Sequence, residues 1–387
     1  MTSKLEKSTK SSKKIILGCL IFVVLILTTN FIINAFKKPP PPFNPYPTSA
    51  EKGFGDLPKL DFESVAISEN SKPEFKIETS DGTLPTLPTI VNVFKTKTPR
   101  QSLTAEDEAN EIANSLGFNE NAIPITPTET KWVNSTKELI INKLYNTVSI
   151  TTNYQKDKQA LAKHEIFPDS SVYSKTAISY LKAADILPES YKEGESNIVT
   201  YLKLNQSYNF EKANSAEDAN FVRVDFFRDI ETVSVEFPER LSQKEINKWL
   251  EYRFFSKLNT DNPSEGLIYI ILGGTRGIND IYELSYVNWE LEDKTTYYLV
   301  TAEDAWNQVK EGKAYLESLL ETNANPFQTY SPYDVNSFLL TDVKIIYYSS
   351  KSYLPYIQPL YKYSGVATLN NDDKQLEFIF YYPAIKY

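Results

Sequence analysis

Residues 301–320, TAEDAWNQVKEGKAYLESLL, begin the part of the chain that decides its fold class. The side chain of Thr301 can accept a hydrogen bond from a backbone N–H at the start of a helix. The acidic side chain three positions later can in turn accept a hydrogen bond from the backbone N–H of Thr301. We therefore expect a helix over residues 301–320. Strand-like segments follow it, VKIIYYSS, PLYKYSGVATL and QLEFIFYYP, and the turn NNDDKQ joins the last two. A helix followed by antiparallel strands is typical of an α+β unit.

The same helix start occurs twice earlier, as TAED at 104–107 and SAED at 215–218. One interpretation is a carboxylate site that the chain uses three times. The other is three helix starts of related units, in which the acidic pair complements the positive end of each helix dipole. We favour the second interpretation.

Helices and antiparallel strands are mixed along the rest of the chain. ETKWVNS, KELIINKL and TVSITTNY predict a meander after a helix at 104–117, and further helices are expected at 171–185 and from Ser242. Other expected strands are NIVTYLKL, FVRVDFFR, TVSVEF, GLIYIILGG and IYELSYVNWEL. Regular βαβ alternation is missing, so the predicted class is α+β with antiparallel sheets and capped helices. We expect two or three related lobes, at residues 51–155, 156–290 and 291–387.

An apolar segment precedes these lobes at residues 15–36. As a helix it would span roughly 33 Å, enough for a hydrocarbon core of about 30 Å. A cleavable signal peptide has a shorter apolar region, followed by a small-residue cleavage site. The sequence ILGC, which ends at Cys19, resembles a lipoprotein signal, but most of the apolar segment follows the cysteine instead of preceding it. We therefore predict an uncleaved transmembrane anchor whose partner is the lipid bilayer.

Lysines predict the orientation of this anchor. Five of them lie in residues 1–14, whereas only Lys37 and Lys38 adjoin the other end. Because the lysine-rich side stays in the cytoplasm, residues 1–14 should form a cytoplasmic tail of a single-pass membrane protein. Residues 37–50 contain four consecutive prolines, which favour an extended linker. The bulk of the chain is thus expected outside the cytoplasm, and its composition suggests a bacterial source.

Charge and composition exclude several functional classes. The chain has a net charge of −9. Residues 1–38 carry seven lysines against one glutamate, so the remainder is more acidic, at −15. A nucleic-acid partner is not expected, because it would require a basic face. Cys19 is the only cysteine and His164 the only histidine, which excludes most transition-metal sites. We expect no metal and no cofactor.

The C-terminal unit resembles a known family. TAEDAWNQVKEGKAYL followed by VKIIYYSSKSYLPYIQPLYKYSG, within residues 290–387, resembles the PepSY-like units at the end of YycH and YycI proteins. In those units a helix that begins with Thr/Ser-x-x-Glu/Asp precedes a strand, and a Y-x-x-P-x-Y strand closes the sheet. The single anchor and the large exterior portion resemble those proteins too. The resemblance implies a regulator that contacts a membrane sensor kinase, and it carries no functional residue onto this chain.

Two local features are weak candidates for a site. ILGGTRGIND, at 271–280, offers Gly273, Gly274 and Arg276 as a ligand loop, since glycine-rich loops can hold anions. Expected strands on both sides favour a hairpin loop instead. His164 could serve as a catalytic base only beside a nucleophile, and its surroundings, LAKHEIFPD, favour a surface or capping role.

Carboxylates support an alternative enzymatic function. Asp225, Asp229, Glu290 and Glu292 are candidates for the carboxylate pair that a hydrolase of envelope polysaccharide or peptidoglycan needs. Asp225, however, is flanked along its strand by Arg223 and Arg228, which predicts ion pairing on the strand face. We expect no catalytic residue, and keep the hydrolase as the alternative.

Tyrosines of the C-terminal unit are the remaining candidates. Alternation along strands would place about half of them in the core, and the others could form a contact surface. Pro355 and Pro359 should keep the segment SSKSYLPYIQP out of a central strand. The leading hypothesis is therefore a membrane-anchored extracytoplasmic binding or regulatory protein, which would modulate a membrane sensor or envelope complex. Its protein partner, in or near the membrane, would contact Tyr353, Tyr356, Tyr361 and Tyr363.

Overall fold

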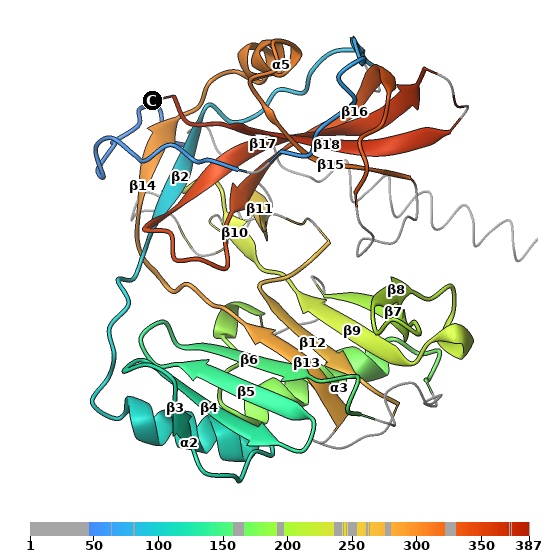
Figure 1. Ribbon diagram of the computed structural model, residues 1–387. Coiled ribbons are helices and arrows are strands. Elements are labelled where there is room, and N and C mark those ends of the chain that lie inside the picture. The colour runs from blue at the N-terminus through green and yellow to red at the C-terminus, as the bar shows by residue number, and fades with distance from the viewer. Residues whose placement is uncertain are drawn as a thin grey trace, which may run out of the picture. The chain divides into compact units, whose positions relative to one another are not determined.

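A computed structural model describes most of the chain beyond residue 45 (Figure 1). The described residues are 46–157, 166–191, 197–235, 242, 244, 246, 254–274, 280–321 and 330–386, without positions 63, 80, 81, 261, 263, 371 and 373. The helices and strands below belong to one compact unit, residues 46–235 with 253–387. Within these ranges, none of the helices combines the length and apolar character that crossing a bilayer requires. The tail 1–14 and the anchor 15–36 lie outside the described residues, as does the linker up to Pro45.

The first sheet, here called the β17 sheet, has nine strands. Its main path is β10-β11-β16-β17-β18-β15; β1 pairs with β16, and β2 pairs with both β14 and β17. The long antiparallel strands β16 and β17, each of 14 residues, form its centre. The strands are β1 (Glu74–Ile77), β2 (Ile90–Thr96), β10 (Asp229–Glu231), β11 (Phe255–Asn259), β14 (Leu291–Tyr298), β15 (Tyr315–Glu321), β16 (Val335–Tyr348), β17 (Tyr356–Leu369) and β18 (Gln375–Pro383).

The second sheet, here called the β9 sheet, also has nine strands, in the order β3-β4-β5-β6-β13-β12-β9-β7-β8. The expected meander is confirmed as β4, β5 and β6, and β6 then pairs with β13. The strands are β3 (Ile123–Pro124), β4 (Glu129–Asn134), β5 (Lys137–Asn142), β6 (Thr147–Thr152), β7 (Ile198–Leu204), β8 (Phe210–Lys212), β9 (Phe221–Phe226), β12 (Ile268–Leu272) and β13 (Ile281–Tyr286).

Three α-helices are described, and each packs its apolar face on one of the sheets. Helices α2 (Ala105–Ser115) and α3 (Ser171–Ala183) lie on the same side of the β9 sheet (Figure 1). Small residues at helical spacing, such as Ala109, Ala113 and Ala177, let these helices approach the strands closely. Helix α5 (Ala302–Lys310) packs Trp306 and Val309 into the core of the β17 sheet. The predicted α+β class is therefore confirmed.

The helix expected over residues 301–320 is half the expected length. Helix α5 ends at Lys310, and Gly312 has a φ of +73°, the left-handed conformation that commonly terminates helices. Beyond this glycine, the residues YLESLLE form strand β15, which pairs with β18. The prediction of a helix to residue 320 was wrong. Residues 315–321 have helix-forming side chains, but their hydrogen bonds to β18 at the edge of the sheet outweigh this weak preference.

The three similar helix starts differ in structure. Thr301 accepts a hydrogen bond from the backbone N–H of Asp304 at 3.0 Å, as predicted. Thr104 and Ser215 make no side-chain cap hydrogen bond. The residues after Ser215 form only the short 3-10 helix η2 (Ala216–Asp218). The prediction of three equivalent capped helices is thus correct only at Thr301, while the helix expected from Ser242 lies largely outside the described residues.

Strand pairing crosses the predicted lobe boundaries. Strand β6, from the expected first lobe, pairs with β13, from the expected middle lobe. Strand β2, near the start of the chain, pairs with β14 and β17 of the expected C-terminal unit. Sequential lobes at 51–155, 156–290 and 291–387 are therefore incorrect, because both sheets recruit strands from distant parts of the chain.

Two local strand predictions also need correction. The segment TVSVEF forms no strand at residues 232–235; the chain pairs just before it, as β10. Pro359 lies within β17, opposite Tyr347 of β16. On the side of the strand that faces Ala384, the carbonyl of Pro359 accepts the N–H of Ala384. The strand therefore uses the carbonyl of this residue and does not require the N–H that proline lacks. A proline is compatible with the strand for that reason.

Candidate functional site

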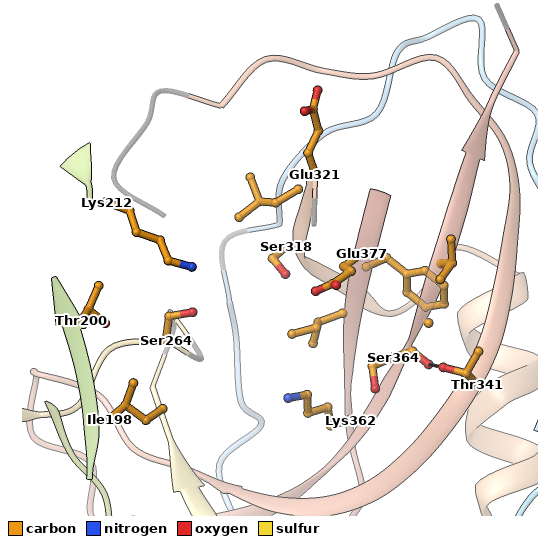
Figure 2. Close-up of a pocket in the computed structure, with 15 residues that line it drawn as sticks. Ile198, Thr200, Lys212, Ser264, Ser318, Glu321, Thr341, Lys362, Ser364 and Glu377 are labelled. Atoms are coloured by element: carbon orange, nitrogen blue, oxygen red, sulfur yellow. Dashed lines mark hydrogen bonds between the residues drawn. The ribbon is translucent and has the colours of Figure 1, made fainter. Parts of the chain in front are cut away.

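A cleft of about 680 Å³ is the first candidate site (Figure 2). One wall comes from β7, β8 and the turn before β12, and the other from β15 to β18. Its polar side chains are five that carry hydroxyl groups and four that are charged. The polar residues are Thr200, Lys212, Ser264, Ser318, Glu321, Thr341, Lys362, Ser364 and Glu377.

Lys362 reaches the cleft because side chains alternate along β17. Its neighbours Tyr361 and Tyr363 are buried on the opposite face of the strand, in the core of the β17 sheet. Figure 2 shows the amino groups of Lys212 and Lys362 directed into the cleft from opposite walls. Lys362 was not among the predicted site residues, although its position between two inward-facing tyrosines, with side chains alternating along the strand, could have identified it.

The environment of Lys362 disfavours its own charge. Burial lowers the pKa of its amino group, and the positive charges of Lys344 and Lys257 lower it further, against the opposing effect of Asp342. Asp342 itself forms an ion pair with Lys344 at 2.8 Å. Among the described residues, Lys362 has neither a hydrogen-bond partner nor an ion-pair partner. A half-buried cation without a counter-ion is a group that an anionic ligand would stabilise.

The two carboxylates of the cleft lie on neighbouring strands. Glu321 ends β15 and forms an ion pair with Lys374 at 2.8 Å. Glu377 of β18 pairs in register with Leu320, one residue before Glu321, and its side chain is exposed. Glu321 is already paired with Lys374. Of the four charged residues that line the cleft, this leaves Lys212, Lys362 and Glu377 without an ion pair to any described residue, two positive charges and one negative charge.

Next to one wall of the cleft, a buried ion pair lies on the same face of the β9 sheet as Thr200. Asp225 accepts two hydrogen bonds from the guanidinium group of Arg223, both at 2.8 Å, and one from the backbone N–H of Gly266, also at 2.8 Å. The guanidinium group stacks on the ring of Tyr269, 3.8 Å from the ring centroid. Thr200 and Ile198 of the cleft pair in register with Arg223 and Asp225. This cluster therefore fixes the strand that forms the wall.

The predicted ion pairing of Asp225 is confirmed for Arg223 only. Arg228 instead donates a hydrogen bond to the carbonyl of Trp289 at 3.1 Å. Burial raises the pKa of Asp225, and the hydrogen bonds and charge of Arg223 oppose this effect. With both carboxylate oxygens accepting hydrogen bonds, Asp225 has a structural role in this arrangement.

Glu283, on β13, is a second carboxylate on this sheet face. It accepts a hydrogen bond from the hydroxyl of Tyr154 at 3.0 Å. Burial raises the pKa of Glu283, while Tyr154, Arg223 and Lys351 act in the opposite direction. The same burial, and the adjacent carboxylate charge, raise the pKa of Tyr154. The pair is held away from water and does not line the cleft.

The expected ligand loop is part of a hairpin in its described portion. Gly273 donates its N–H to the carbonyl of Asp280 at 3.0 Å, which closes the connection between β12 and β13. A Cβ at this position would lie 2.5 Å from Oδ1 of Asp280, so the glycine is required by close packing. Arg276 lies outside the described residues, as does His164, and the ligand role of Gly273, Gly274 and Arg276 stays a prediction.

The four tyrosines proposed as a contact surface fall into two groups. Tyr361 and Tyr363 are buried, and their hydroxyls donate to the carbonyls of Val300 and Ala302 at 2.7 and 2.8 Å. A partner cannot contact these two side chains, so their inclusion in a partner surface was wrong; they position the start of α5. Tyr353 and Tyr356 are half-buried and keep part of their rings accessible.

Comparison with known proteins adds little. No protein-family model matches the chain, and neither does any curated protein. One crystal structure, of an uncharacterized protein from Eubacterium rectale ATCC 33656, aligns with 77% of this chain and 84% of its own, at 12% identity and a TM-score of 0.34. A likeness this weak carries no argument about fold or function. In the part of the chain that the structure describes, no group of three or more His, Cys, Asp or Glu residues could hold a metal ion.

Proposed function

We propose that this chain is a membrane-anchored extracytoplasmic binding or regulatory protein, whose cleft binds a small anionic ligand that carries hydroxyl groups. The observation that carries the proposal is Lys362, a half-buried cation in the cleft with no counter-ion among the described residues. A ligand carboxylate or phosphate would supply that charge, and hydroxyls such as those of Ser318 and Ser364 would bind its polar groups.

Lys362→Met tests the ligand. Methionine keeps most of the length of the side chain and removes its charge, so we expect a stable fold and at least about a tenfold loss of affinity, or 1.4 kcal/mol. The probes are glucuronate for a carboxylate and glucose 6-phosphate for a phosphate, titrated calorimetrically into the full chain. Lys76→Met is the matched control, because Lys76 lies on β1 of the same sheet, is paired with Glu74 at 2.8 Å and does not line the cleft.

The outcomes separate binding from catalysis. If neither probe binds, or if Lys362→Met binds both as well as the unaltered chain does, the anion site is wrong. The alternative function, a carboxylate-dependent hydrolase of envelope polysaccharide or peptidoglycan, would use Glu377 as its free acidic group. Turnover of peptidoglycan that Glu377→Gln abolishes would replace the binding proposal by the hydrolase.

A regulatory role further requires a protein partner, which the resemblance to YycH and YycI proteins implies. We place the contact at Tyr353 and Tyr356. Truncation of a tyrosine hot spot typically costs about 2 kcal/mol or more of binding free energy. Tyr353→Ala should therefore weaken capture of a membrane partner in a pull-down. Tyr361→Phe, which removes only a buried hydroxyl, should not change capture; equal capture by both variants would contradict the placement.

A further inference from the structure

A second concave site lies apart from the cleft, at the turn between β5 and β6 and the segment that joins β13 to β14. This groove has a volume of about 390 Å³ and is lined by Tyr145, Asn288, Trp289, Glu290, Lys97 and Arg100, among others. Pockets of this size accommodate small ligands, and a few placed polar groups orient them. We propose that the Trp289 groove binds a neutral saccharide, a ligand class different from that of the cleft.

An exposed and rigidly supported aromatic ring is the first observation. Tyr145 is 38% exposed, although a large ring is usually better buried. Trp289 packs against it edge-on, with the centroids 6.0 Å apart, and Tyr353 packs on Trp289 at 5.6 Å. The indole of Trp289 is itself fixed by a hydrogen bond from Nε1 to the carbonyl of Ser350 at 2.8 Å. The ring thus forms a preorganised platform.

The turn that carries Tyr145 is also fixed. Oδ1 of Asn142 accepts the backbone N–H groups of Leu144 and Tyr145, both at 3.0 Å. Asn146 follows with a φ of +50°, a conformation that asparagine tolerates better than most residues. The platform therefore needs little ordering when a ligand binds, which lowers the entropic cost of association.

An unused hydrogen-bond acceptor is the second observation. Oδ1 of Asn288 is buried and receives no hydrogen bond within the described structure. The side chain of this residue hydrogen-bonds to Tyr286, which leaves its carbonyl oxygen available. Buried acceptors normally have a donor, and a ligand hydroxyl in the groove would supply one.

Four of the five charged side chains of the groove form ion pairs with one another, and only Arg100 has no ion-pair partner among the described residues. Glu290 forms an ion pair with Lys97 at 2.8 Å, and Glu292 forms one with Lys95 at 3.0 Å. Paired carboxylates and ammonium groups can still accept from and donate to hydroxyls, while Arg100 offers further donors. A sugar ring combines an apolar C–H face, suited to the tyrosine platform, with hydroxyls that both donate and accept.

Saturation-transfer NMR on the full chain, in a detergent without sugar groups, tests this inference. The probes are triacetylchitotriose, cellotriose, maltotriose and, for comparison, trialanine. We expect at least one trisaccharide to receive saturation from the protein and Tyr145→Ala to weaken its binding at least about tenfold, or 1.4 kcal/mol. Tyr145→Phe, which keeps the ring, should bind nearly normally.

Tyr298→Ala is the matched control, since Tyr298 is also 38% exposed but lies on β14 outside the groove. It should leave the saccharide signal unchanged. The inference is overturned if no trisaccharide binds, if only trialanine does, or if Tyr145→Ala binds as the unaltered chain does. Thermal unfolding of each variant shows that a lost signal does not come from a lost fold.

Discussion

At the scale of single residues, the charges of the β9 sheet illustrate how burial changes acid–base behaviour. Arg223 and Asp225 compensate each other through two hydrogen bonds, so the pair is stable where it is buried. Among the described residues, no cation lies in hydrogen-bond contact with Glu283, and a tyrosine hydroxyl is its donor. The cost of burying its charge is therefore less completely offset, which agrees with the raised pKa.

Glu283→Gln should reveal this cost through its pH dependence. Because the pKa of Glu283 is raised in the folded protein, the folded state binds the proton more tightly than the unfolded chain does. The free energy of unfolding of the wild-type protein therefore increases as the pH falls from the raised pKa of folded Glu283 to the lower pKa that this residue has in the unfolded chain. Glutamine mimics the protonated form and can still accept from Tyr154. We expect the variant to be more stable than wild type at pH 7, with the difference shrinking towards pH 4.

Urea unfolding at several pH values measures this difference. Glu290→Gln serves as a control, because Glu290 is exposed and paired with Lys97 at the surface. A constant difference between Glu283→Gln and wild type over the whole pH range would contradict the argument.

At the scale of elements, the capping hydrogen bond of α5 shows that similar sequences at helix starts can form different structures. Thr301 caps its helix through the N–H of Asp304, whereas the corresponding Thr104 donates instead to the side chain of Glu108. The cap matters for the β17 sheet because α5 places Trp306 against Tyr363, with centroids 5.2 Å apart. Loss of the cap should therefore destabilise the helix and the packing below it.

Thr301→Ala should reduce the free energy of unfolding by about 1 kcal/mol, the usual cost of losing a side-chain N-cap. Thr104→Ala and Ser215→Ala, at the two starts without such a hydrogen bond, should change it by less than about 0.5 kcal/mol. Chemical denaturation of the three variants provides the comparison. Equal losses in all three would show that the repeated motif, and not the observed cap, sets the energetics.

Most elements could be predicted from the sequence, because their signals are local. Alternation identified the meander of β4 to β6, the TAED motif identified α2, and α3 was expected at residues 171–185. Partner choice could not be predicted, since nothing within residues 90–96 specifies that β2 pairs with β14 and β17. The cleft was missed for the same reason: Lys362 and Thr200 are far apart in the sequence, and only the assembled strands bring them to one cavity.

At the scale of the whole molecule, the anchor and its orientation remain predictions from the lysine distribution. Protease added to intact cells should digest the region from about residue 44 onward, and it should spare the tail at residues 1–14. Mass spectrometry of the surviving fragments checks this. A protected C-terminal region would contradict the orientation, and a mature chain that begins at Cys19 would indicate lipidation instead.

The pairing of β2 with strands from the end of the chain also sets an order in time. A ribosome delivers residues 90–96 early, but β14 begins only at Leu291 and β17 at Tyr356. All strands of the β9 sheet have been synthesised once Tyr286 has emerged. We therefore expect the β9 sheet to form while β2 is still unpaired, because β14 and β17 have not yet been synthesised. A chain that stops after Tyr286 would keep one sheet complete and leave its earliest long strand exposed to aggregation.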